Sequence, residues 1–257
     1  MRKALIIPDC HIPFECLDSY RIMLDVAQAV YGKPNTKKPG LEEIVILGDF
    51  LDIYGLSRFD ADPTLGDLSE LYDREIECGN VRLDELERRF PLAKKIYLEG
   101  NHELRMRRFL KTMAPALRNR LTIFKELQID KRPRFKWIPF DKLQSYQVLG
   151  LEVYARHCPV AGGTCANNAK QAGESILYGH THQIGMGTFV NKITGKLIHA
   201  YNLGCLIDMK SKVFDYVPTR PNWAHGFGFV SGDYGHYQVD IVEIKNKKAI
   251  FNGKVYK

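Results

Sequence analysis

The chain has 257 residues, 45% of them apolar, and no Pro-, Gly- or Ser-rich linker divides it, so we predict a single domain over residues 1–257. The net charge is +7. The six cysteines have no CxxC spacing, which argues against a disulfide scaffold and predicts reduced thiols. The first apolar run spans only four residues, too short for a secretory signal or a membrane span, so we expect a soluble, cytoplasmic protein without a membrane partner.

Six short apolar runs, each ending in polar residues or glycine, recur along the chain. Their continuous apolarity predicts strands that are buried on both faces. In chain order they read KALIIPD, EEIVILGD, KKIYLEGN, LEVYARH, ESILYGH and IHAYNLG. Helical spacing of apolar residues occupies 16–30 and 68–90, between the first three runs. Strand, helix and strand in succession imply βαβ crossovers.

The C-terminal part of the chain has a different pattern. QVDIVEI alternates polar and apolar residues, NKK follows as a turn, and AIFNGKVYK completes the segment. This pattern predicts an antiparallel hairpin with one solvated face. Together the two halves predict an α/β fold with a mixed sheet, or with two packed sheets flanked by helices.

Polar residues gather directly after five of the predicted strands. The clusters are Asp9-Cys10-His11, Gly48-Asp49-Phe50-Leu51-Asp52, Gly100-Asn101-His102-Glu103, Arg156-His157 and Gly179-His180-Thr181-His182. They contain five of the eight histidines. Because ligands of open α/β sheets bind beyond the carboxyl ends of the strands, these clusters can converge in space. A ligand set of Asp, His and Asn without organised cysteines suits Mn²⁺, Fe or Zn²⁺. The number of candidate ligands is too large for one ion and favours two ions that share one carboxylate.

These blocks, in this order, resemble the signature of the calcineurin-like metallophosphoesterases, which runs DxH, GDxxD, GNHE/D, a lone His and GHxH. The ordered set covers residues 9–182 and is specific, although each block alone is weak. The resemblance implies a four-layer α/β/β/α sandwich in which helices flank two packed mixed sheets. It also implies two divalent metal ions, with Mn²⁺ preferred over Fe, Zn²⁺ or Ni²⁺. A hydroxide that bridges the two ions would attack the phosphorus atom.

Carried over position by position, the family pattern assigns a role to each matching residue. One metal would be held by Asp9, His11 and His182, and the other by Asn101, His157 and His180. Asp49 would bridge the two ions. His102 would be the catalytic histidine that faces the substrate, with Asp52 hydrogen-bonded to it.

Three departures from the family pattern affect this interpretation. Ile53 follows the second Asp of GDxxD where Ser/Thr protein phosphatases have Arg, so a protein phosphatase is disfavoured. Cys158 follows His157 where many members have glycine, which makes His157 the least secure ligand. The segment Tyr201 to Cys205, YNLGC, resembles the family's NPGS turn but lacks its Pro and Ser, and we assign Asn202 no catalytic role.

The charge distribution bears on the substrate. Residues 105–136 contain eleven Lys and Arg against two acidic residues, a local charge of +9, so the rest of the chain sums to −2. Arg105 and Arg108 share a helical face directly after GNHE and are the candidate substrate-binding residues. Excess positive charge beside the expected catalytic histidine favours a phosphodiester of nucleic acid or a nucleotide as the substrate.

Two other functions remain open at this stage. One is a phosphomonoesterase that acts on nucleotides or small phosphates, and the other is an inactive nucleic-acid-binding module on the same fold. The segment RPNWAHGFGFV resembles the tail of phage-encoded members, which would place the protein in the host cytoplasm. The sequence leaves the oligomeric state undetermined.

Overall fold

The computed structural model describes residues 1–32, 40–57, 66–215, 222–233 and 235–257. Two mixed β-sheets dominate them. The eight-stranded sheet has the spatial order β13 (Lys254–Tyr256), β12 (Lys248–Phe251), β11 (His236–Lys245), β10 (His225–Asp233), β1 (Arg2–Ile7), β2 (Glu43–Ile46), β3 (Lys94–Leu98), β4 (Phe135–Ile138). The five-stranded sheet has the order β5 (Tyr146–Gln147), β6 (Val153–Ala155), β7 (Ser175–Tyr178), β9 (Leu197–Leu203), β8 (Ile184–Val190).

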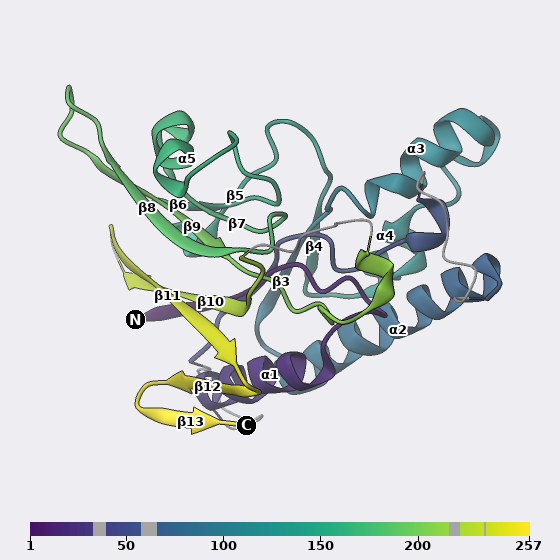
Figure 1. Ribbon diagram of the computed structural model, residues 1–257, viewed down its shortest axis with the longest axis horizontal. Helices are drawn as coiled ribbons and strands as arrows, with labels where there is room; N and C mark the ends of the chain where they lie inside the picture. The colour runs from purple at the N-terminus through teal and green to yellow at the C-terminus, as the bar shows by residue number, and fades with distance from the viewer. Residues whose placement is uncertain (33–39, 58–65, 216–221, 234) are drawn as a thin grey trace.

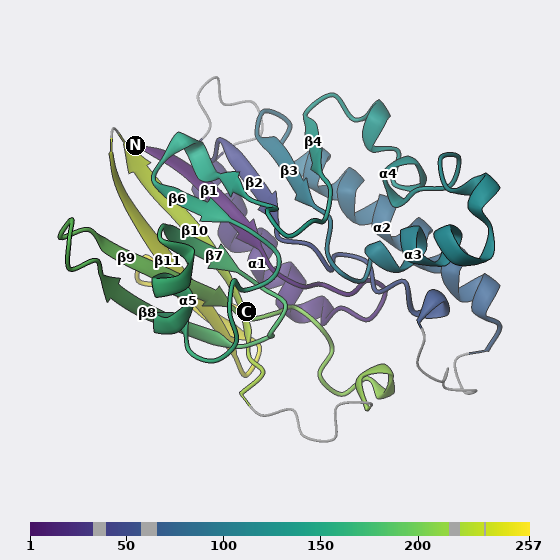
Figure 2. The same ribbon diagram turned by 90° about the horizontal axis from the view of Figure 1, so that it is seen from above.

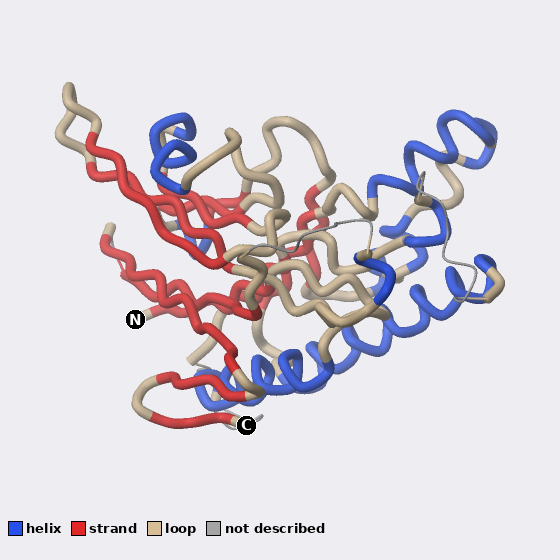
Figure 3. Tube along the Cα trace, viewed as in Figure 1, coloured by secondary structure: helices blue, strands red, loops and turns tan. Residues whose placement is uncertain are grey.

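Helices cover the outer face of each sheet. The α-helices are α1 (Leu17–Tyr31), α2 (Leu68–Arg89), α3 (Leu104–Met113), α4 (Ile123–Glu126) and α5 (Cys165–Ala172). Figure 1 shows α1 and α2 below the larger sheet and α5 above the smaller one, and Figure 3 shows the central strands between these helices. The predicted architecture, two packed mixed sheets flanked by helices, is confirmed.

The alternation of side chains along β1 explains why its whole apolar run is buried. Leu5 and Ile7 pack into the core under α1 and α2, whereas Ala4 and Ile6 pack into the core between the two sheets. A strand with period two must bury both faces when layers lie on both sides of it. A third core, which includes Ala169 of α5, lies on the outer face of the smaller sheet.

All six apolar runs form strands, namely β1, β2, β3, β6, β7 and β9, and the predicted helices 16–30 and 68–90 appear as α1 and α2. Asp67 begins α2 as its N-cap, since its side chain accepts from the amides of Ser69 and Glu70. The predicted C-terminal hairpin is present as β11 and β12, and β13 pairs antiparallel with β12 to form a second hairpin. No α-helix within the described part of the chain is long and apolar enough to cross a lipid bilayer.

The topology brings the polar loops together. Strands β1, β2 and β3 are parallel neighbours, as are β6 and β7 in the other sheet. Figure 2 shows β1 to β4 side by side, so the loops after them leave from one edge. Parallel strands place their carboxyl ends at the same edge of a sheet, which is where ligands bind in α/β folds.

Candidate metal centre

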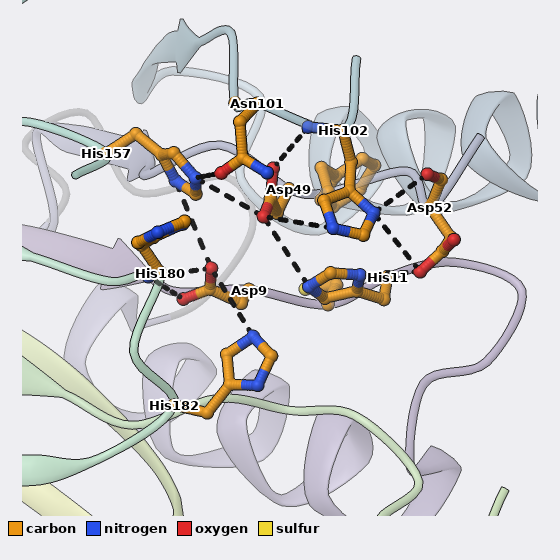
Figure 4. A network of polar contacts seen from close by, with 12 residues as sticks. Asp9, His11, Asp49, Asp52, Asn101, His102, His157, His180 and His182 are labelled. Atoms are coloured by element: carbon orange, nitrogen blue, oxygen red, sulfur yellow. Dashed lines mark hydrogen bonds and ion pairs between the residues drawn. The ribbon is translucent and has the colours of Figure 1, made fainter. Parts of the chain in front are cut away.

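The five predicted clusters converge on one centre. Figure 4 shows the carboxylates of Asp9 and Asp49 in the middle, with imidazole rings around them. These residues come from the loops after β1, β2, β3, β6 and β7. The structure thus brings together all seven predicted metal ligands, namely Asp9, His11, Asp49, Asn101, His157, His180 and His182.

Unusual backbone geometry places several of these side chains. His11, Asp49, His180 and His182 have φ values of 51°, 46°, 67° and 59°. Non-glycine residues seldom adopt this left-handed conformation, and where they do the cost is borne by the surrounding structure. Turns of this kind aim consecutive polar side chains at one point just beyond a strand.

Two glycines allow the loops after β2 and β3 to touch. Gly48 has φ +94°, and a Cβ at this position would lie 2.7 Å from the Cα of Gly100. A Cβ on Gly100 would in turn collide with the amide nitrogen and the carboxylate of Asp49. Only glycine at both positions lets the backbone pass this close to Asp49.

Asp49 is the hub of the site. Its Oδ2 lies 3.3 Å from Nε2 of His157, 3.7 Å from Nε2 of His11 and 3.9 Å from Nε2 of His102. Asp9 Oδ1 lies 3.9 Å from both His157 Nδ1 and His182 Nε2. One carboxylate that faces several ring nitrogens is placed where it could contact a cation together with them.

Four overlapping groups of potential ligand atoms, each within 4.8 Å of one another, surround this hub. They are Asp9-His11-His182, Asp9-Asp49-His157, His11-Asp49-His102 and His157-Cys158-His180. The first is the set expected for one metal. Within the set expected for the other metal, Asn101 Oδ1 lies 2.8 Å from His157 Nε2.

The chemistry of His11 fits a cation at this place. Its Nδ1 lies 2.7 Å from Asp52 Oδ2, whereas its buried Nε2 has no hydrogen-bond partner among the described residues and faces Asp49. Burial holds the pKa of His11 below its usual value, so the ring is neutral near pH 7. A carboxylate that fixes one ring nitrogen leaves the lone pair of the other free for a metal.

His157 is held in the same manner. Its Nδ1 lies 2.8 Å from the carbonyl oxygen of Leu47, so an N–H there can donate and Nε2 is left facing Asn101 and Asp49. Burial opposes protonation of the ring, but the Asp49 carboxylate outweighs it and raises the pKa of His157 to about 9. The Asp49 carboxylate thus favours a proton on this ring, and a cation bound at Nε2 would compete with that proton.

Asp52 contacts both His11 and His102, in different ways. Its carboxylate forms the short contact with His11, whereas His102 Nδ1 lies 2.9 Å from the main-chain oxygen of Asp52 and 3.4 Å from its carboxylate. The predicted contact with His102 is therefore made mainly by the backbone. The Asp52 carboxylate instead orients His11.

Arg105 reaches the site and Arg108 does not contact it. Arg105 Nη1 donates to the carbonyl and the carboxylate of Asp52, and its Nη2 lies 3.0 Å from His102 Nε2. Burial opposes charge on His102, but Asp49 and Asp52 outweigh it and raise its pKa above the usual value. Arg108 is exposed, and no hydrogen bond or ion pair joins its side chain to the centre within the part of the chain that the structure describes.

Glu103 supports the centre from behind, a role that the sequence analysis did not assign. Its buried carboxylate accepts hydrogen bonds from the amides of Asp49, Phe50, Leu51 and Gly100, and from the hydroxyl of Tyr97. These bonds tie the loop after β2 to the loop after β3. The signal was present, because an acid that directly follows Gly-Asn-His at a strand end is available to such amides.

A second buried acid, Glu75 of α2, yields a prediction for pH dependence. Its Oε1 accepts from the Tyr54 amide at 2.9 Å, and burial, reinforced by the Asp52 charge, raises its pKa to about 9. Since the folded state holds a proton that the unfolded state releases near pH 4.5, the wild type loses stability as the pH rises from about 5 to 9.

Glu75→Gln should remove this loss. We expect similar free energies of unfolding near pH 4 and a variant more stable by about 5 kcal/mol at pH 8, measured by urea unfolding in the presence of a chelator. The exposed Glu77→Gln on the same helix is the control and should follow the wild type. Parallel pH profiles for Glu75→Gln and wild type would show that Glu75 is ionised in the folded protein.

Comparisons with known proteins find distant relatives. No protein-family model matches the sequence. The chain is 24% identical to the Gene 54 protein of Mycobacterium phage L5 and 26% identical to that of Mycobacterium phage D29, covering 99% of this chain and 98% of each relative. Among solved structures it is similar to Vacuolar Protein Sorting 29 from Cryptosporidium parvum, with 14% identity, a TM-score of 0.44, and 99% and 94% of the two chains covered.

Proposed function

We propose that this protein is a dinuclear metal-dependent phosphoesterase that hydrolyses phosphodiester bonds of nucleic acid or nucleotides. The observation that carries the proposal is the set of four overlapping ligand groups. Each of Asp9, His11, Asp49 and His157 belongs to two of these groups. A structural site for one ion does not need so many ligands, and it closes its coordination shell. The phage relatives support a location in the host cytoplasm.

Two divalent ions, preferably Mn²⁺, would supply positive charge that binds the phosphoryl group and lowers the pKa of a bound water. Asp9, His11 and His182 would hold one, Asn101, His157 and His180 the other, and Asp49 both. The protein itself supplies His102, whose ring is fixed at Nδ1 by the Asp52 carbonyl and whose Nε2 contacts Arg105. If a substrate phosphate draws the Arg105 guanidinium away, Nε2 is free to carry a proton, which the raised pKa favours, and to deliver it to the leaving oxygen.

The distribution of cations supports an extended anionic substrate. Of the basic segment, Arg132 is buried and pairs with Asp84 and Glu87, and Arg107 pairs with Glu99, so part of the predicted patch is structural. Other cations of the segment are exposed and have no acidic partner among the described residues, namely Arg108, Lys111, Arg118 and Arg120. Cations left without acids on and after α3 suit phosphates that flank the scissile one.

The proposal is tested by comparing bis-p-nitrophenyl phosphate with p-nitrophenyl phosphate in the presence of Mn²⁺. We expect a higher kcat/KM for the diester, and hydrolysis of at least one member of a panel of single-stranded DNA, double-stranded DNA, RNA and cyclic nucleotides. Preference for the monoester would identify a phosphomonoesterase instead. Less than about one bound ion per chain, with no turnover of either ester, would identify a binding module.

His102→Ala should separate metal binding from turnover. We expect the variant to bind metal as the wild type does, because seven other ligands remain, while kcat for the diester falls by about 10²- to 10⁴-fold. Metal content is measured by mass spectrometry and turnover by p-nitrophenolate release. His236→Ala, at an exposed residue of β11, is the control. Equal kcat in His102→Ala and wild type would exclude His102 from the reaction.

A further inference from the structure

A cavity of about 360 Å³ lies beside the metal centre and is not explained by it. Its walls come from the loop after β6, the start of α5 and the ends of β7 and β9, and include Gly162, Cys165, Tyr178, Thr181, Gln183 and Asn202. None of the described residues that line it is charged. This volume lies in the range of pockets that hold small organic ligands, and the polar side chains described in its walls are all neutral.

Asn202 lines this cavity and carries an unsatisfied polar atom. The residue is 4% exposed, its Nδ2 lies 2.6 Å from Thr181 Oγ1, and its Oδ1 has no hydrogen-bond partner within the described residues. Leaving such a group without a partner costs about 1–3 kcal/mol. A ligand N–H that donates to Oδ1 would remove this cost.

Asn202 lies on a face of β9 that is otherwise apolar. Ile198 and Ala200, four and two residues earlier on the same face, pack against Ala169 of α5. The apolar layer thus ends at Asn202, where the strand reaches its carboxyl end. A polar side chain that ends a packed face at the rim of a cavity is available to a ligand rather than to the core.

The cavity adjoins the residues expected to hold metal. Thr181 is bonded to both His180 and His182, and Pro159, also in the wall, lies two residues after His157. Consecutive Cα atoms are about 3.8 Å apart, so the wall begins within one or two residues of the metal centre. A group esterified to a phosphate at the centre can therefore extend into the cavity.

We propose that the cavity binds the nucleoside attached to the scissile phosphate, with Asn202 as the residue that reads its base. The inference rests on the proposed function and specifies its substrate. A nucleobase is uncharged and carries N–H donors and acceptors on its edge, which match an asparagine amide and the hydroxyl and amide groups of Thr181 and Gln183. A simple alkyl or aryl ester would leave Asn202 Oδ1 unsatisfied.

Gly162 lies in the cavity wall and has room for a side chain. A Cβ on Gly162 would have no heavy atom within 4 Å, so a larger side chain fits there without displacing the backbone. Because Gly162 is part of the cavity wall, we expect a leucine there to reduce the space assigned to the nucleoside. Gly162→Leu is therefore a second variant that blocks the pocket and does not alter the buried strand.

The test compares kcat/KM for p-nitrophenyl thymidine 5′-phosphate with that for bis-p-nitrophenyl phosphate, two diesters with the same leaving group. We expect the ratio of the two values to fall at least tenfold in Asn202→Leu and in Gly162→Leu. Gln171→Leu, at an exposed amide of α5 outside the cavity wall, should keep the wild-type ratio. Circular dichroism tests whether each variant is folded. If Asn202→Leu is not folded, the result for Gly162→Leu decides the question.

The outcomes distinguish this inference from the function on which it rests. If folded Gly162→Leu keeps the wild-type ratio while both esters are hydrolysed, the cavity does not bind the nucleoside and the phosphodiesterase proposal stands. If metal-loaded wild type hydrolyses neither ester, both proposals are wrong.

Discussion

Asp49→Asn should abolish turnover of phosphodiesters and most metal binding. The substitution keeps the shape of the side chain but replaces the carboxylate that faces ring nitrogens of His11 and His157. His157 and His102 hold the pKa of Asp49 well below its usual value against the effect of burial, so the charge is present at neutral pH. We expect the dissociation constant for Mn²⁺ to rise at least 100-fold, since losing an outer-shell partner alone costs 10- to 100-fold, and kcat to fall about 10³-fold or more.

Isothermal titration and metal analysis measure this loss, and circular dichroism tests whether the fold is retained. Asp130→Asn, at an exposed carboxylate, is the matched control and should bind metal as the wild type does. An Asp49→Asn protein that still binds two ions with wild-type affinity would show that Asp49 does not bridge them. The same result would remove the shared ligand on which the dinuclear proposal depends.

The apolar runs predicted the strands because each is continuous and short. They could not predict which strands pair, since this depends on contacts between distant segments. β10, which begins at His225, lies antiparallel to β1 and extends the larger sheet on the side opposite β2. Nor can periodicity within KALIIPD show that Leu5 faces helices and Ile6 faces the other sheet, because both faces are apolar.

The motifs predicted which residues meet, but not how each side chain is held. Asp52 orients His11 through its carboxylate because His11 has a left-handed backbone that directs Nδ1 toward it. A count of charges over residues 105–136 could not separate Arg105, which reaches the centre, from Arg132, which is buried against α2 acids. Those outcomes depend on loop conformation and burial, which a linear pattern does not contain.

Glu103→Ala should be the most destabilising single substitution near the site. The side chain is fully buried and accepts five hydrogen bonds, four from amides of the loops after β2 and β3 and one from the Tyr97 hydroxyl. Truncation leaves these buried donors without the acceptor that they have in the wild type. We expect the free energy of unfolding to fall by about 4 kcal/mol, because each buried donor left unpaired costs about 1–3 kcal/mol and the loops can relax in part.

Urea unfolding of the metal-free protein measures this change, with Glu77→Ala, at an exposed position of α2, expected within about 0.5 kcal/mol of the wild type. Glu103→Gln should lie between them, since it keeps one acceptor oxygen but turns an amide donor toward the N–H groups. Metal binding should weaken in both Glu103 variants, because the Asp49 amide is one of the groups that Glu103 fixes. A Glu103→Ala protein as stable as Glu77→Ala would mean that other groups satisfy these amides, and that the turn holding Asp49 forms without Glu103.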